Sequence, residues 1–136
     1  MKPEQRFYKS KVSPVLNRVP GLTHDRVETG SVSLGVPDVV YTRSRRTGFL
    51  EVKVSRTLKG LDLSEWRASQ RTWSRRHVLC GATVFLLVEC EFGDLLLPVD
   101  EDRPKSLWKL TEAQALDLAD RGEAWWWNFD TAREVL

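Results

Sequence analysis

Residues 82–89 read Ala-Thr-Val-Phe-Leu-Leu-Val-Glu, an almost continuous apolar run that Gly81 separates from the helix pattern before it. A run of this kind is typical of a central strand that is covered on both faces of its sheet. The turn Phe92-Gly93-Asp94 then leads into a further apolar strand. The chain is therefore expected to form a sheet with helices packed against both faces.

Apolar periodicity and turn residues predict the other elements. Helices are expected at 3–12, about 62–79 and about 111–121, and strands at 24–28, 35–41, 48–54, 82–89 and 95–99. Pro14 is expected to kink or end the first helix, and Thr111 is a plausible N-cap for the last. We expect a single domain over residues 1–136, in the α/β class, with a central mixed sheet of about five strands flanked by helices.

The two strands at 35–41 and 48–54 form a hairpin around the polar connector at 42–47. Because side chains alternate along a strand, Glu51 and Lys53 share one face of the second strand, while the alternate apolar residues share the other. Asp38 opens the first strand, directly after a Gly and a Pro that constrain the backbone. The hairpin thus carries charged side chains on a strand that otherwise suits a core.

Two neighbouring carboxylates need a cation. At about 4 Å, Asp38 and Glu51 would repel each other by roughly 4 kcal/mol at an effective dielectric of about 20. A hard divalent ion such as Mg²⁺, or Mn²⁺ as a substitute, relieves this repulsion and also binds phosphate oxygens. Lys53 can then orient a water or stabilise charge on a phosphate. In the alternative interpretation, Asp38 is a turn residue and the strand face is simply exposed.

These residues resemble a known nuclease motif. The segment Gly-Val-Pro-Asp38, followed by Glu51-Val-Lys53, is similar to the motif of the PD-(D/E)XK nucleases, and most similar to the bacteriophage VRR-NUC and Holliday-junction-resolvase-like members. The resemblance takes in Arg26-Val-Glu28 and Gln70 and covers roughly residues 2–90. It implies a restriction-endonuclease-like core at about 2–100, beyond which the acidic, Trp-rich extension at about 101–136 matches nothing in the family.

The resemblance also implies a ligand set for the metal. Asp38, Glu51 and the backbone carbonyl of Val52 would bind the ion, and Glu28 or Glu4 would complete its shell. For Glu4 the alternative is an acid favoured by the positive end of a helix dipole. For Glu28 the alternative is a solvated side chain.

The second predicted helix carries one polar residue on an apolar face. Leu63, Trp66, Gln70, Trp73 and His77 recur at helical spacing. A buried amide without partners costs about 1–3 kcal/mol, so Gln70 needs one. We expect that partner to be a site carboxylate, a metal-bound water or a phosphate, and the resemblance also places a Gln at this point. The alternative is a bond to nearby backbone.

Charge is divided unevenly along the chain. Residues 1–81 carry 16 Lys/Arg against 7 Asp/Glu, whereas residues 82–136 carry 5 against 12. Basic charge therefore gathers where the site is expected, as an enzyme acting on a polyanion requires. An exposed, solvated face is the alternative for the helical arginines. The residues expected to contact DNA are Arg43, Arg45, Arg46, Arg56, Lys59, Arg67, Arg71 and Arg75.

Other features limit the location and the partners. No apolar run approaches the roughly 18–20 residues of a membrane span, and no signal peptide opens the chain. Cys80 and Cys90 lack metal-type spacing, which favours a reducing compartment. We expect a cytoplasmic protein, in the host cytoplasm if phage-encoded. The Trp125-Trp126-Trp127 run is expected to be buried in a mixed strand or a subunit contact, because its acidic surroundings disfavour stacking on DNA bases.

The sequence therefore predicts a Mg²⁺-dependent DNA endonuclease that acts on Holliday junctions or other branched DNA in recombination or repair. No segment resembles a base-reading module, which favours recognition of structure over sequence. Two coordinated cuts in a junction imply a homodimer. Two other functions stay open: a DNA-binding module with a vestigial site, and a nuclease subunit active only with a partner protein.

Overall fold

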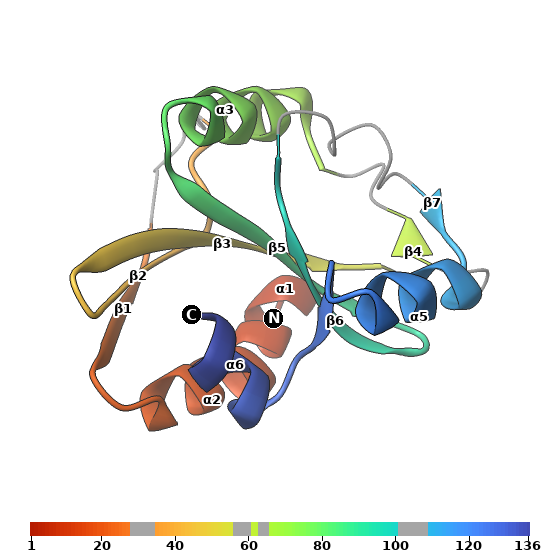
Figure 1. Cartoon of the computed structure of the whole chain (residues 1–136), viewed down its shortest axis with the longest axis horizontal. Helices are drawn as coiled ribbons and strands as arrows, with labels where there is room; N and C mark the ends of the chain where they lie inside the picture. Colours follow the sequence, from red (N-terminus) through yellow and green to blue (C-terminus); the bar gives the residue numbers. More distant parts are fainter. Residues whose placement is uncertain (28–34, 56–60, 63–65, 101–108) are drawn as a thin grey trace.

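A six-stranded mixed sheet forms the centre of the molecule, in the order β1-β2-β3-β5-β6-β8. Figure 1 labels all of these strands except β8. The computed structural model describes residues 1–27, 35–55, 61–62, 66–100 and 109–136. Within the sheet, β3 and β5 pair in parallel and every other neighbouring pair is antiparallel. The strands are β1 (Leu22–Arg26), β2 (Val39–Arg43), β3 (Arg46–Val54), β5 (Thr83–Cys90), β6 (Gly93–Pro98) and β8 (Trp125–Trp126). The predicted α/β class and mixed sheet are confirmed.

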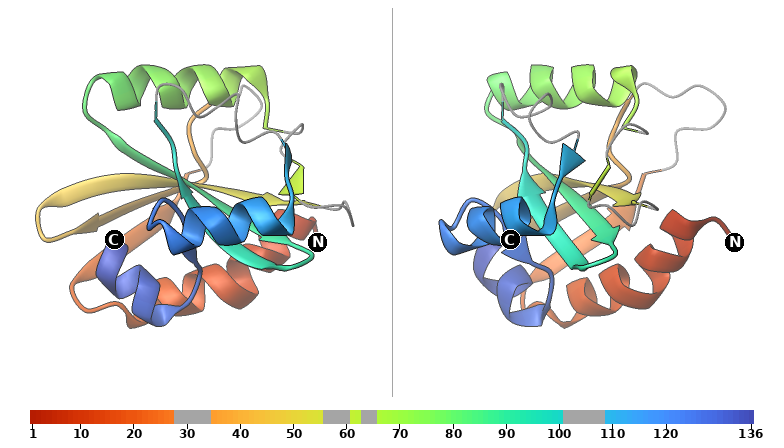
Figure 2. Two further views of the ribbon diagram at one scale, coloured as in Figure 1. Left: turned by 45° about the vertical axis from the view of Figure 1, so that its right-hand side comes forward. Right: turned by 90° about the vertical axis from the view of Figure 1, so that its right-hand side faces the viewer.

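Helices cover both faces of this sheet (Figure 2). One face packs against α3 and α5, and the other against the N-terminal helices and α6. A separate two-stranded ladder pairs β4 (Leu61–Asp62) with β7 (Lys109–Leu110). The helical elements are α1 (Pro3–Phe7), the π-helical η1 (Tyr8–Val12), α2 (Ser13–Arg18), α3 (Ala68–Leu79), α5 (Glu112–Asp120) and α6 (Phe129–Val135).

Strand β5 is the central strand that its apolar run predicts. Leu86 faces the cluster beneath α3, whereas Leu87 faces the cluster beneath α1 and α2, and both are fully buried. Because side chains alternate along a strand, only a sequence that is apolar at every position satisfies both faces. The helix before it ends as expected, since Gly81 adopts the left-handed conformation that closes α3, with φ of 100°.

The first helical segment is longer than the sequence predicts. It continues past Pro14 to Arg18 instead of ending near residue 12. The π-helical turn of η1 ends at Val12, two residues before the proline, and its Ser13 N–H donates to the Tyr8 carbonyl. This wider turn makes room for a ring that would crowd the preceding turn of a regular helix, and Pro14 then occupies the first turn of α2.

The hairpin connector is shorter than predicted. Strands β2 and β3 extend until Arg43 pairs with Arg46, which leaves only Ser44 and Arg45 as the turn. The Thr42 and Thr47 hydroxyls are 2.9 Å apart across the two strands. Threonine is β-branched and suits a strand. The prediction placed Thr42 and Thr47 in the connector because it considered only their polarity, and it was wrong for these two residues.

The helix predicted at about 62–79 begins later, at Ala68. Residue 62 belongs to β4, and Leu63 lies outside the described residues. Trp66 precedes the helix but is completely buried in the cluster beneath α3. Position 66 is therefore apolar because it is buried by tertiary packing, although its spacing from Gln70 and Trp73 is that of a helical face.

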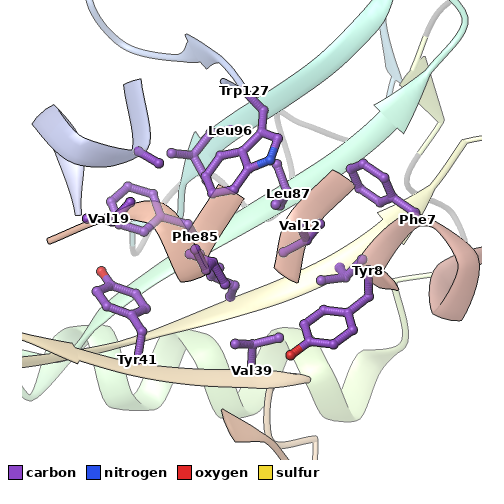
Figure 3. Packing of buried hydrophobic residues seen from close by; sticks show 14 residues of the cluster. Phe7, Tyr8, Val12, Val19, Val39, Tyr41, Phe85, Leu87, Leu96 and Trp127 are labelled. Carbon is purple, nitrogen blue, oxygen red and sulfur yellow. The ribbon is translucent and has the colours of Figure 1, made fainter. Parts of the chain in front are cut away.

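The C-terminal extension packs on the rest of the fold. Thr111 caps α5, where its hydroxyl accepts from the Gln114 N–H at 3.2 Å, as expected. Trp125 and Trp126 form the edge strand β8, and Trp127 is buried in the cluster shown in Figure 3. The Trp127 indole donates to the Lys11 carbonyl at 2.9 Å. Helix α6, which the sequence did not predict, follows directly. In the described ranges, no helix combines the length and apolarity that crossing a bilayer requires.

Candidate active site

An open cavity of about 510 Å³ lies beside the C-terminal half of β3. Its walls come from the start of α1, the end of β1, the residue before β2, β3 itself and the start of α3. The cavity brings together seven residues that the sequence singled out as candidates, which are Glu4, Asp38, Glu51, Val52, Lys53, Arg67 and Gln70. Glu28 lies outside the described residues, so the structure does not place it.

The end of the β2–β3 ladder positions Asp38. The last backbone pair of this ladder is Val39 with Leu50. Beyond this pair the Asp38 side chain supplies the acceptor in place of a strand carbonyl, and its Oδ2 accepts from the Val52 N–H at 2.9 Å. Because the N–H and C=O of one strand residue point to the same side, the Val52 carbonyl also faces this edge. Asp38 and the Val52 carbonyl therefore present oxygens to the same region.

Glu51 is a buried carboxylate in an unfavourable setting. Its side chain is only 1% exposed. Burial raises the pKa of Glu51 well above its ordinary value, repulsion from Asp38 raises it further, and Lys53 opposes the rise. Glu51 Oε2 has no hydrogen-bond donor among the described residues. A buried oxygen without a donor, next to a second carboxylate, has unused capacity to bind a cation.

Gln70 links this carboxylate to Lys53 and to the start of α3. Its amide nitrogen donates to Glu51 Oε1 at 3.0 Å, and its Oε1 accepts from Lys53 Nζ at 3.0 Å. The same Oε1 accepts from the Arg67 N–H at 3.0 Å. Both partners considered for Gln70 are therefore present, a site carboxylate and nearby backbone. Lys53 Nζ also lies 3.6 Å from Glu51 Oε1, so the three side chains form one network.

Gly35 holds the segment before Asp38 against α3. Its φ is 83°, and a Cβ on this residue would lie 2.1 Å from the Ser69 carbonyl oxygen. Only glycine permits so close a contact with the first turn of the helix that carries Gln70. The sequence identified this glycine as a constraint on the backbone, but its contact with α3 depends on tertiary packing.

The donor set fits a hard divalent cation. Asp38, Glu51 and the Val52 carbonyl are oxygen ligands of the kind that Mg²⁺ and Mn²⁺ prefer. The described residues contain no group of three His, Cys, Asp or Glu side chains arranged to hold a metal. Two protein carboxylates with a carbonyl are compatible with Mg²⁺, which keeps several waters in its shell. Glu4 lines the cavity and is the described candidate for a third carboxylate.

Two basic residues of the cavity were not assigned a role by the sequence, Lys2 and Arg26. The Arg26 guanidinium lies 4.9 Å from the centre of the Tyr8 ring, a cation–π contact that leaves its N–H groups available to a ligand. The signal for Arg26 was its place in the Arg-Val-Glu segment, whereas no sequence signal marked Lys2.

The arginines expected to contact DNA fall into different settings. Arg67 reaches the cavity, and Arg75 is exposed on α3. Arg71 donates to the Trp66 carbonyl, and Arg43 donates to the Pro20 and Arg133 carbonyls, so both have structural contacts. Arg45 in the turn and Arg46 at the start of β3 are exposed. Arg56 and Lys59 lie outside the described residues.

Comparisons with known proteins identify the fold. Neither family models nor curated protein sequences match the chain. Among solved structures, the chain resembles Hjc, a Holliday junction resolvase from the archaeal hyperthermophile Archaeoglobus fulgidus. The TM-score is 0.56 at 23% identity, and the match covers 82% of this chain and 91% of Hjc. The chain thus has the resolvase-like fold that its motif predicted.

Proposed function

We propose that the chain is a metal-dependent DNA endonuclease that cuts Holliday junctions or other branched DNA. The observation that carries the proposal is the network of Glu51, Lys53 and Gln70 next to Asp38 in an open cavity. A buried carboxylate with a raised pKa costs stability, and such groups are concentrated at functional sites. The likeness to Hjc supports junctions as the substrate.

The residues of the cavity suit the parts that phosphodiester hydrolysis requires. Asp38, Glu51 and the Val52 carbonyl would hold Mg²⁺ or Mn²⁺, and Glu4 or Glu28 would complete the shell. When bound, the ion supplies Lewis-acid stabilisation of the phosphate and a water of lowered pKa. Gln70 fixes Lys53 by accepting a hydrogen bond from its ammonium group at 3.0 Å, which would hold the positive charge where negative charge develops on the phosphate.

The remaining parts of the proposal concern partners and origin. Arg67 and Arg75, at the start and along the exposed side of α3, would contact DNA phosphates. We propose a homodimer, since a junction needs two coordinated cuts. We also propose that the enzyme belongs among the phage VRR-NUC nucleases of recombination or repair and works in the host cytoplasm.

The test is cleavage of linear, flapped, splayed and four-way junction DNA with Mg²⁺, with Mn²⁺ and with EDTA. Lys53→Ala should abolish cleavage while folding and metal binding remain nearly intact, because Lys53 acts on the transition state. Asp38→Asn should lose both metal binding and cleavage. Lys11→Ala is a matched control. It removes a lysine that also pairs with carboxylates, Glu89 and Asp94, but does not line the cavity.

The outcomes separate this proposal from its rivals. Metal-dependent cutting of branched DNA that Lys11→Ala retains and Lys53→Ala loses would support it. If Lys53→Ala cuts as well as the parent chain, the role of Lys53 is wrong. If the parent chain binds branched DNA but cuts none of the substrates with either metal, it is a binding module or needs a partner protein.

A further inference from the structure

The turn between β2 and β3 has unusual residues for its geometry. Ser44 and Arg45 both have positive φ, 52° and 66°. Two-residue turns of this kind strongly favour Asn-Gly or Asp-Gly, because other side chains are strained in the left-handed conformation. A long charged side chain at the second position therefore opposes the stability of the hairpin. Its presence there points to a function for the turn.

The tip of this hairpin carries two arginines with no acidic partner. Arg45 and Arg46 are exposed, and their side chains form no ion pair or hydrogen bond with the described part of the chain. Arg43, one residue before the turn, donates instead to the Pro20 carbonyl and to the Arg133 carbonyl of α6. The base of the turn is thus fixed to the body of the protein, while both guanidinium groups at its tip remain available.

Strand β3 connects this tip directly to the cavity. Glu51 follows Arg46 by five residues in the same strand, and at about 3.3 Å per residue this places the two Cα atoms about 17 Å apart. Helix α3 has 12 residues and, at about 1.5 Å per residue, covers a similar length on one face of the sheet. Its N-cap Arg67 lines the cavity. Its C-terminal end leads into β5 (Figure 1), and Thr83 of β5 pairs with Gly48 of β3.

We propose that the β2–β3 turn is a second DNA contact, which grips the phosphates of a duplex arm about five base pairs from the cut. The span of about 17 Å corresponds to about five base pairs at 3.4 Å per pair. A guanidinium group matches phosphate oxygens in geometry and charge, and the tip presents two of them from consecutive residues. This inference rests on the proposed function, because it takes the cavity as the place where the strand is cut. It predicts a minimum arm length for tight binding.

The experiment uses four-way junctions whose arms are either 4 or 12 base pairs long, each arm closed by the same hairpin loop. Binding is measured by fluorescence anisotropy in EDTA at several salt concentrations. The test variant is Arg45→Gly with Arg46→Thr, which removes both charges and relieves the strained turn. The control is Arg121→Ala, which removes an arginine of α5's C-terminal end that pairs with Asp117 and Glu123.

We expect the parent chain and the control to bind the long-armed junction about tenfold more tightly than the short-armed one. The test variant should bind both junctions with equal affinity and melt at the same or a higher temperature. Its salt dependence on long arms, the slope of log K against log salt, should be shallower by about 2, because two phosphate contacts are lost.

Two results would overturn the inference: a test variant that keeps both the arm-length preference and the salt slope, or a parent chain without such a preference. A variant that melts well below the parent would show that Arg45 stabilises the turn, which also contradicts it. A parent chain that cuts both junctions with Mg²⁺ or Mn²⁺ but ignores arm length leaves the nuclease function standing. A parent chain that cuts neither junction would refute the proposed nuclease function, independently of this inference.

Discussion

Replacing Glu51 by Gln tests whether this buried carboxylate is kept for binding a cation. Lys53 Nζ lies 3.6 Å from Glu51 Oε1, a separation worth about 5 kcal/mol of attraction at an effective dielectric of about 20. The pKa of Glu51 is nevertheless raised, so burial and the repulsion from Asp38 together outweigh this attraction. In the absence of metal, the charge on Glu51 therefore destabilises the fold.

The pH dependence follows from the direction of this shift. A carboxyl with a raised pKa binds its proton more tightly in the folded state than in the unfolded state. Its stabilising contribution is present below the ordinary glutamate pKa of about 4.3 and is lost as the pH rises through the folded-state pKa. For one proton, the free energy of unfolding falls by at most about 1.4 kcal/mol per pH unit in this window.

Glu51→Gln should remove this loss. The amide can donate where Oε2 now has no donor among the described residues, and satisfying such an atom is worth about 1–3 kcal/mol. We expect the variant to be more stable than the parent at pH 8 in EDTA by about this amount. For a chain of this size, that corresponds to a rise in Tm of roughly 3–6 °C per kcal/mol.

The assay is urea unfolding at pH 4.5, 6 and 8, in EDTA and with Mg²⁺ or Mn²⁺. Metal should stabilise the parent at pH 8 and have little effect on Glu51→Gln, because a ligand stabilises only the state that binds it. Asp94→Asn is the control. Asp94 also has a pKa raised by burial, but it lies outside the cavity, so this variant should keep the metal response. The reasoning is refuted if Glu51→Gln is less stable than the parent at pH 8 in EDTA.

Three further predictions concern the supports of the site. Gly35→Ala should lower the stability by several kcal/mol and reduce cleavage, because a Cβ would lie 2.1 Å from the Ser69 carbonyl oxygen; an unchanged thermal melt would contradict this. Gln70→Leu should lower the Tm and should slow single-turnover cleavage at least tenfold, since it removes hydrogen bonds to Glu51 and Lys53. A stable, fully active variant would exclude Gln70 from the site. Thr111→Ala should cost about 1 kcal/mol in urea unfolding without affecting cleavage.

Some properties of the site follow from the sequence because they depend on local periodicity. The alternation of side chains along a strand places Glu51 and Lys53 on one face, and the structure has them in one network. The same rule makes an apolar run such as 82–89 a strand that is buried on both faces. Helical spacing likewise placed Gln70 on the covered side of α3, where it is buried.

Other features could not be predicted because they depend on contacts between segments far apart in the chain. The start of α3 was placed too early, because Trp66 is buried by tertiary packing just before the helix and mimics a helical position. For the tryptophan run the sequence left a mixed strand and a subunit contact open, and Trp125 and Trp126 form a strand because β6 provides an edge with which they pair. Trp66 has no local signal that separates a buried position before the helix from a position on the helix.

The sequence by itself determined which groups are available for chemistry, and the tertiary structure decided how they meet. The motif supplied Asp38, Glu51 and Lys53 in order. The end of the β2–β3 ladder brings the Asp38 carboxylate to the Val52 N–H, and the packing of α3 on the sheet, with Gly35 against its first turn, brings Gln70 to Glu51. Periodicity acts over a few residues, whereas these contacts depend on how whole elements pack, which no short pattern encodes.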